Sequence, residues 1–171
     1  MTKNHSKLLH YTFFDSTLGK LWITLHKKKL CGIYFHSSDL YYFQHKHKYT
    51  LKAIVKLPSV LERELTDYFK GKLKKFQYPI CFLTGTAFQQ KVWQVLTKIP
   101  YGRTKTYGEV AKAVKSPKAA RAVGSANGSN QIPIVVPCHR VVASKSLGGY
   151  SEGLDIKKQL LQLESGIRFK V

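Results

Sequence analysis

Three capping patterns limit where helices can begin in this chain of 171 residues. Ser59, Thr86 and Thr106 are each followed three residues later by Glu or Gln, and in such a capping box the two side chains bond each other's backbone N–H groups. Apolar residues then recur at helical spacing. Gly71 and the Pro100-Tyr-Gly102 stretch stop the first two patterns. The chain is therefore predicted to form three helices beginning at these positions.

The first 35 residues have a different pattern, which is typical of β-strands. Residues 8–14, 21–25 and 30–35 are short apolar runs. The turn cluster at 15–19 separates the first two runs, and Lys27-Lys-Lys29 separates the last two. We expect an antiparallel meander with a lysine-containing turn.

Residues 36–50 are rich in His, Tyr and Lys and have no clear period. His36, His45 and His47 are candidate metal ligands, but no Cys or carboxylate cluster accompanies them, so a solvated loop or strand is favoured. The cysteines Cys31, Cys81 and Cys138 form no Cys-x-x-Cys pair, which indicates neither a disulfide framework nor a zinc knuckle. We predict no metal and no cofactor.

Charge is the most unbalanced feature of the composition. The chain has 29 Lys and Arg against 9 Asp and Glu, a formal charge of +20. A polyanion is the natural partner of such a chain, and nucleic acid is favoured over a merely solvated basic surface.

The remaining composition indicates a globular protein outside the membrane. Hydrophobic residues make up 43% of the chain, and no apolar run approaches the ~20 residues of a membrane span. The first residues contain no apolar signal core, so we expect a cytoplasmic protein. The composition changes near Thr84-Gly85. We therefore predict an N-terminal domain over 1–84 and a C-terminal domain over 85–171.

The region after Thr106 indicates a helix-turn-helix. Lys115-Ser116 forms a tight turn, and Pro117 is suited to the first position of a second helix running to about Asn127. Two short helices joined in this way occur in many DNA-binding proteins, although a generic helical hairpin gives the same pattern. The basic charge favours the DNA-binding interpretation.

The second of these helices is built mostly from small residues. They are Ala119, Ala120, Ala122, Gly124 and Ala126. Arg121 lies about 200° around the helix from Ala119, on the opposite face. A long cation on a thin helix can enter a groove or take the place of a displaced base, while a solvated arginine is the plain alternative.

Residues 132–142 form an apolar run, typical of a buried segment, that polar residues interrupt in its middle. Pro137 is followed by a thiol, an imidazole and a guanidinium in Cys138, His139 and Arg140, and the run resumes at Val141. Such a breach of patterning is expected at a functional site. A buried, inert Cys beside a surface His-Arg pair is the alternative.

The last predicted helix covers about 154–164, with core contacts from Leu154, Leu160, Leu161 and Leu163. Glu164 falls on the apolar side of this helix. A buried carboxylate needs a partner, for which a histidine is the attractive candidate. A fraying helix end in water remains the alternative.

Together these motifs resemble the O6-alkylguanine-DNA alkyltransferase family, also called methylated-DNA–protein-cysteine methyltransferases. The motifs are Pro137-Cys-His-Arg-Val141, Thr106-Tyr-Gly-Glu-Val-Ala111, Lys118-Ala-Ala-Arg-Ala-Val-Gly124, Asn130 and Gly148-Gly-Tyr-Ser151. The resemblance covers 85–166 strongly. The first half matches in outline, through Ser16-Thr-Leu-Gly-Lys20 and the order of strands and helix.

The resemblance implies a role for each matching residue. Cys138 accepts the alkyl group, His139 and Glu164 activate the thiol through a water, and Asn130 braces the adjoining turn. The implied substrate pocket comprises Tyr107, Pro133, Val141, Tyr150, Ser151 and Lys157. The implied DNA-binding residues are Arg121, Tyr107, Ala119, Ala120, Gly124 and Ser125. The zinc ligands of some relatives have no match here.

We therefore expect an α+β protein with a small N-terminal antiparallel sheet and helix, followed by a mainly helical domain containing a helix-turn-helix. The resemblance implies repair of O6-alkylguanine in double-stranded DNA by a monomer that transfers one alkyl group to itself. O4-alkylthymine is a further candidate substrate. The rival hypothesis is a non-enzymatic helix-turn-helix protein that binds DNA or recognises lesions. Because relatives of that kind lack the acceptor cysteine, Cys138 favours the enzyme.

Overall fold

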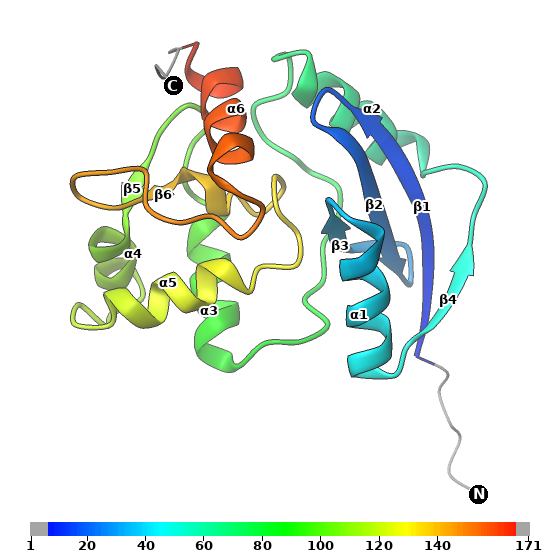
Figure 1. The fold of residues 1–171 in the computed structure, drawn as a ribbon, viewed down its shortest axis with the longest axis horizontal. Helices are drawn as coiled ribbons and strands as arrows, with labels where there is room; N and C mark the ends of the chain where they lie inside the picture. The colour runs from blue at the N-terminus through cyan, green and yellow to red at the C-terminus, as the bar shows by residue number, and fades with distance from the viewer. Residues whose placement is uncertain (1–6, 167–171) are drawn as a thin grey trace, which may run out of the picture.

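The computed structural model describes residues 7–166, which form a four-stranded sheet beside a group of helices (Figure 1). Strands β1 (Leu8–Ser16), β2 (Gly19–His26) and β3 (Lys29–Tyr34) pair antiparallel in sequence order, which confirms the predicted meander. Strand β4 (Thr50–Ala53) adds to the free edge of β1 in parallel. The α+β class is confirmed.

Successive side chains of a strand point to opposite faces of the sheet, and in this sheet both faces carry apolar side chains. A helix therefore covers each face. Helix α2 (Ser59–Phe69) lies on one face, where its Leu61 and Leu65 share a core with Leu21 and Ile23 of β2. This core continues into the helical half of the chain. Helix α1 (Ser37–His47) lies on the other face, where Leu40 and Phe43 join Leu9, Cys31 and Tyr34 in a second core.

Helix α1 corrects the expectation of a loop or strand over 36–50. Only Leu40 and Phe43 are buried within it, so its apolar stripe is too short to show a period in the sequence. The helix ends where Lys48 adopts the left-handed conformation, with a φ of 56°. The predicted capping box at Ser59 is also wrong. Pro58 is the capping residue of α2, and no side chain bonds its first turn.

The capping boxes at Thr86 and Thr106 are confirmed. They begin α3 (Ala87–Leu96) and α4 (Tyr107–Ala113). In α4 the Thr106 Oγ1 accepts from the Glu109 N–H at 3.2 Å, while a Glu109 carboxylate oxygen accepts from the Thr106 N–H at 2.7 Å. These bonds satisfy N–H groups that a helix leaves unpaired at its first turn.

Helix α5 (Ala120–Gly128) starts later than predicted. Pro117 lies in the connection between α4 and α5, where the Ala119 N–H donates to the Ser116 carbonyl at 2.9 Å. Lys115 turns the chain with a φ of 61°. The last helix, α6 (Leu154–Ser165), follows the prediction in extent, but Leu154 is exposed and supplies no core contact.

Two short connections place Cys138 and its neighbours among these helices. Strand β5 (Lys105–Thr106) pairs in parallel with β6 (Val141–Val142), so the start of α4 lies beside the chain that leaves His139. A single 3-10 turn, η1 (Cys138–Arg140), precedes β6. Within residues 7–166 no helix is long and apolar enough to cross a membrane.

Candidate active site

Asn130 shapes the segment that carries the cysteine. Its Oδ1 accepts from the Ile132 N–H at 3.0 Å, and its Nδ2 donates to the Val136 carbonyl at 2.8 Å. The enclosed chain turns sharply, with Ile134 at a φ of 74°, where a β-branched residue is strained. The side-chain amide therefore fixes both ends of a turn that would otherwise relax, and this turn delivers Cys138.

The turn buries all three polar groups that interrupted the apolar run. Cys138, His139 and Arg140 are 2%, 0% and 6% exposed. The alternative of a buried Cys beside a surface His-Arg pair is right about the burial of Cys138 but wrong about the pair, because the imidazole and guanidinium are buried as well and need partners.

Glu164 supplies those partners from α6. Its carboxylate lies 2.7 Å from His139 Nε2 and accepts from Arg140 Nε at 2.8 Å and Nη2 at 2.9 Å. The side chain of Glu164 is fully buried. Of the two alternatives for this carboxylate, the structure has the paired one rather than the frayed helix end.

Two further donors reach Glu164 that the sequence did not suggest. The Tyr68 hydroxyl of α2 donates to Oε1 at 2.7 Å, and the Gly102 N–H donates to Oε2 at 3.2 Å. Burial alone would raise the pKa of Glu164, but the hydrogen bonds from His139 and Arg140 hold it well below its usual range. Glu164 is therefore a carboxylate.

His139 is a neutral imidazole in this cluster. Burial lowers its pKa, and Glu164 opposes that effect only in part. Since Nε2 faces the carboxylate, it carries the proton as donor, and the tautomer so assigned leaves a lone pair on Nδ1. Nδ1 is buried and has no hydrogen-bond partner among residues 7–166. The imidazole thus presents a basic nitrogen away from Glu164.

Cys138 is held as a neutral thiol. Burial raises its pKa, and hydrogen bonds with Asn130 and Tyr150 lower it less. Its Sγ lies 4.0 Å from the Tyr150 hydroxyl. Asn127 of α5 donates from Nδ2 to the Cys138 carbonyl at 3.2 Å. Asn127 was missed, although a polar residue four positions after Val123, on the buried side of α5, is a detectable signal.

Lys157 organises the loop that carries Tyr150. Its buried ammonium donates to the carbonyls of Val141 at 2.6 Å, Leu147 at 2.5 Å and Gly149 at 3.1 Å. Burial lowers its pKa to about 8. Because one ammonium binds all three carbonyls, it holds the two ends of the loop together. Lys157 therefore positions the backbone of the loop that carries Tyr150.

Tyr107 is packed between this loop and α5. A side chain added at Gly148, which has a φ of 68°, would place its Cβ 2.9 Å from the Tyr107 ring, and one at Gly124 would lie 3.8 Å away. Glycine is required at 148 both by the backbone and by this contact. Gly148 therefore allows the ring to lie against this loop, whereas a Cβ at Gly124 would make only an ordinary van der Waals contact with it.

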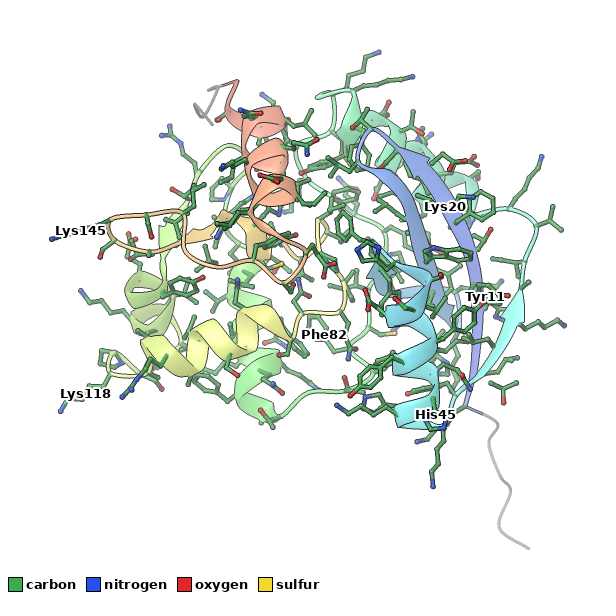
Figure 2. All side chains as sticks on the ribbon, viewed as in Figure 1. Tyr11, Lys20, His45, Phe82, Lys118 and Lys145 are labelled. Atoms are coloured by element: carbon green, nitrogen blue, oxygen red, sulfur yellow. The ribbon has the colours of Figure 1, made fainter. Side chains whose placement is uncertain are left out.

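The other predicted residues divide into buried and exposed sets. Pro133 and Val141 are buried, whereas Ser151 is exposed next to Glu152. On α5, Arg121 and Ser125 are exposed, and Ala119, Ala120 and Gly124 are half-buried. Lys118 and Lys145 extend from the same side of the molecule as α4 and α5 (Figure 2). Cations and small residues therefore share this side.

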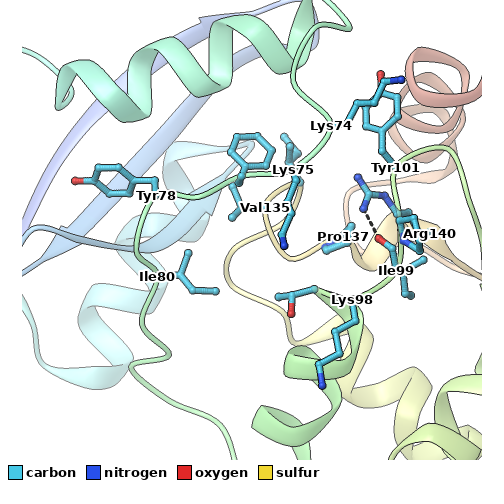
Figure 3. Close-up of a pocket in the computed structure, with 14 residues that line it drawn as sticks. Lys74, Lys75, Tyr78, Ile80, Lys98, Ile99, Tyr101, Val135, Pro137 and Arg140 are labelled. Carbon is cyan, nitrogen blue, oxygen red and sulfur yellow. Dashed lines mark hydrogen bonds between the residues drawn. The ribbon is translucent and has the colours of Figure 1, made fainter.

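A cavity of about 780 Å³ lies beside the segment that carries Cys138 (Figure 3). Pro137 and Arg140 line it together with Lys74, Lys75 and Lys98. Arg140 Nη1 donates to the Ile99 carbonyl at 2.6 Å at this wall. Cys138 and Tyr150 do not line it, so it is separate from the thiol. Among the described residues no group of three or more His, Cys, Asp or Glu side chains could hold a metal ion.

Comparisons with known proteins match both halves of the chain. The 6-O-methylguanine DNA methyltransferase DNA binding domain matches residues 87–166, and the ribonuclease-like domain of the same proteins matches residues 9–82. The methylated-DNA–protein-cysteine methyltransferase of Mycobacterium bovis is 40% identical over 161 residues, which cover 92% of this chain and 93% of that protein.

Two further relatives extend the comparison. The Methanosarcina acetivorans protein of the same name is 55% identical over 103 residues, which cover 60% of this chain and 65% of that protein. A Mycobacterium tuberculosis protein named OGT, solved in complex with DNA, is 39% identical with a TM-score of 0.78, covering 92% of this chain and 93% of that one. The chain belongs to the methylated-DNA–protein-cysteine methyltransferase family.

Proposed function

We propose that this protein repairs O6-alkylguanine in DNA by transferring the alkyl group to its own Cys138, once per molecule. The observation that carries the proposal is the buried line of Cys138, His139 and Glu164, with the His139 Nδ1 lone pair unpartnered among the described residues. A thiol next to a base that a third group orients is the usual arrangement for nucleophilic catalysis.

The proton of the thiol goes to His139 Nδ1 through a bridging water. A buried polar atom of this kind is satisfied by water in many proteins. The Cys138 sulfur then attacks the alkyl carbon, a C–S bond forms, and the bond from carbon to the guanine oxygen breaks. Glu164 stabilises the imidazolium that results.

The leaving guanine oxygen develops negative charge, which a hydroxyl donor relieves. The Tyr150 hydroxyl, 4.0 Å from Cys138 Sγ, is the proposed donor, and Ser151 is a second donor nearby in sequence. The thioether product is stable, and no reductant or second thiol is assigned to restore Cys138, so one molecule repairs one base.

Double-stranded DNA is the proposed partner. The Mycobacterium tuberculosis relative has been solved in complex with DNA, and the charge of +20 favours phosphate contacts. The target oxygen lies inside the duplex, so the base must be flipped out. In this proposal Arg121 fills the space that the flipped base leaves in the stack, and Tyr107 packs against the backbone of the flipped nucleotide. Helices α4 and α5 form the helix-turn-helix.

We also propose the division into 1–84 and 85–171, a monomeric state and a cytoplasmic location. The first is supported by the separate matches to residues 9–82 and 87–166. One apolar core runs through both halves, so the two parts should unfold together.

Duplex DNA carrying O6-methylguanine with a labelled methyl group tests the acceptor. Label should appear on Cys138 alone, with close to one methyl group per protein. Cys138→Ser should abolish transfer and leave DNA binding intact, which separates the proposal from the rival non-enzymatic binder. Label on Cys31 or Cys81, or many transfers per protein, contradicts the mechanism.

A further inference from the structure

The two cysteines outside the acceptor site lie side by side in the N-terminal half. Leu30 of β3 forms an isolated parallel bridge with Ile80, through bonds from the Leu30 N–H to the Pro79 carbonyl and from the Cys81 N–H to the Leu30 carbonyl, each 2.9 Å. One residue further along, this register places Cys31 beside Cys81.

The pairing geometry suits a covalent bond between the two sulfurs. Paired chains run about 4.8 Å apart, which falls inside the Cα separations of about 4.4–6.8 Å that disulfides span. Paired residues of neighbouring strands also point to the same face. The thiols are in contact, since the side chains of Cys31 and Cys81 are hydrogen-bonded to each other.

The two thiols differ in access and in charge. Cys31 is 1% exposed and donates a hydrogen bond to the Thr24 hydroxyl at 3.4 Å, whereas Cys81 is half-buried. The hydrogen bond with Cys31, together with the Lys29 ammonium, lowers the pKa of Cys81 to about 7 against the effect of burial. The same hydrogen bond and burial raise the pKa of Cys31. Cys81 therefore has the lower pKa of the two and carries thiolate near neutral pH, whereas Cys31 keeps its proton.

We propose that Cys81 and Cys31 form a peroxide-reactive dithiol, a modification site distinct from Cys138. The Cys81 thiolate attacks one oxygen of hydrogen peroxide, the O–O bond breaks, and the products are a sulfenic acid on Cys81 and a hydroxide, which takes a proton from solvent to become water. The Cys31 sulfur then attacks the Cys81 sulfur, the S–S bond forms, and the departing hydroxide takes the Cys31 proton as a second water. Two thiols are oxidised by two electrons, and one peroxide is reduced.

Cys138 serves as the internal comparison for this chemistry. It is 2% exposed, and burial raises its pKa, so it presents little thiolate to a peroxide. Cys81 has both the thiolate and the resolving partner. The chain therefore keeps its alkyl acceptor reduced while a separate pair meets the oxidant. The new bond would join β3 to the segment leading into α3, far along the chain from Cys138.

Hydrogen peroxide applied to the full chain, followed by alkylation of the remaining thiols and peptide mapping, tests the proposal. Free thiols should fall from three to one, with a Cys31–Cys81 linked peptide lighter by two hydrogens and an unmodified Cys138. The oxidised protein should still be alkylated at Cys138 by O6-benzylguanine, whether or not duplex repair is retained.

Two variants make the order of events testable. Cys31→Ala should leave Cys81 as a sulfenic acid that dimedone captures, and Cys81→Ser should leave Cys31 unmodified under the same treatment. Because the mapping on the unaltered chain stands by itself, a variant that fails to fold does not remove the test. Oxidation of Cys138 as fast as Cys81, a link that includes Cys138, or links only between molecules would overturn the proposal.

Discussion

Two arginines of this protein are held in opposite ways, Arg140 at the acceptor site and Arg121 on α5. Arg140 is 6% exposed, and its guanidinium is bonded to Glu164 and to the Ile99 carbonyl. Arg121 is exposed, and its side chain forms no hydrogen bond or salt bridge with another of residues 7–166. The first cation is committed to the protein's own structure, and the second is available to a ligand. Substitutions around Arg140 should therefore lower stability and transfer from every substrate, whereas substitution of Arg121 should lower only the repair of duplex DNA.

The largest effect is expected for Glu164→Gln. The variant removes the negative charge that faces His139 and Arg140, so a buried guanidinium loses its counterion, which costs about 3–5 kcal/mol of stability in comparable pairs. Loss of base catalysis should slow transfer by about 100-fold or more. Because both substrates require the same thiolate, duplex DNA and free O6-benzylguanine should slow by a similar factor.

The stability deficit of Glu164→Gln should also depend on pH. The folded protein holds the pKa of Glu164 below its usual range, so the carboxylate contributes stability above the unfolded pKa of about 4.3 and loses it as pH falls further. Urea unfolding of both proteins should show a gap that is full at pH 7 and narrows below about pH 4. A gap that is constant with pH, or a rate loss seen with duplex alone, would contradict the role given to this carboxylate.

Arg121→Ala should have an intermediate effect confined to duplex DNA. Flipping a base from a duplex costs a few kcal/mol, so losing the side chain that fills the stack should slow duplex repair by about 10- to 100-fold. Transfer from free O6-benzylguanine should be nearly unchanged. Arg63→Ala, an exposed arginine on α2, is the matched control for loss of one positive charge. Equal slowing of both substrates would place Arg121 in the fold or the acceptor site instead.

What the sequence could predict follows from how local each signal is. The boxes at Thr86 and Thr106 and the strands up to Tyr34 depend on residues close in the chain, and the structure has them. Helix α1 was missed because its two buried side chains are too few to show a helical period in the sequence. Pro117 was predicted to begin the second helix, but it lies in the turn before α5. Prediction from local patterns fails where packing against distant parts of the chain determines the secondary structure.

The site shows the same limit. Cys138 and His139 are adjacent in sequence, and Glu164 stood out as a carboxylate on an apolar face, so all were found. Tyr68 was treated as an ordinary core residue of α2, because nothing near it in the chain indicates that its hydroxyl meets a carboxylate 96 residues away. Such a partner becomes visible only once the two halves of the chain are packed together.

Tyr68→Phe should give the smallest effect, and it tests whether the N-terminal half tunes the acceptor. The change deletes one donor to the Glu164 carboxylate, a bond to a charged group worth about 1.5–3 kcal/mol. With fewer donors the carboxylate becomes more basic and stabilises the imidazolium better, so the pKa of His139 should rise. Transfer requires neutral His139, so the rising limb of the rate–pH profile should move to higher pH.

Tyr101→Phe is the matched control, because the Tyr101 hydroxyl donates at 3.0 Å to the Leu163 carbonyl of the same helix and not to the carboxylate. It should loosen α6 to a similar degree and leave the pH profile in place. A shift in Tyr68→Phe alone assigns Tyr68 a positioning role through Glu164. The role is contradicted if the rate–pH profile shifts equally in both variants, or if it shifts in neither while both lose stability equally. Tyr68 would then only pack α2 against α6, and the N-terminal half would not influence the pKa of His139.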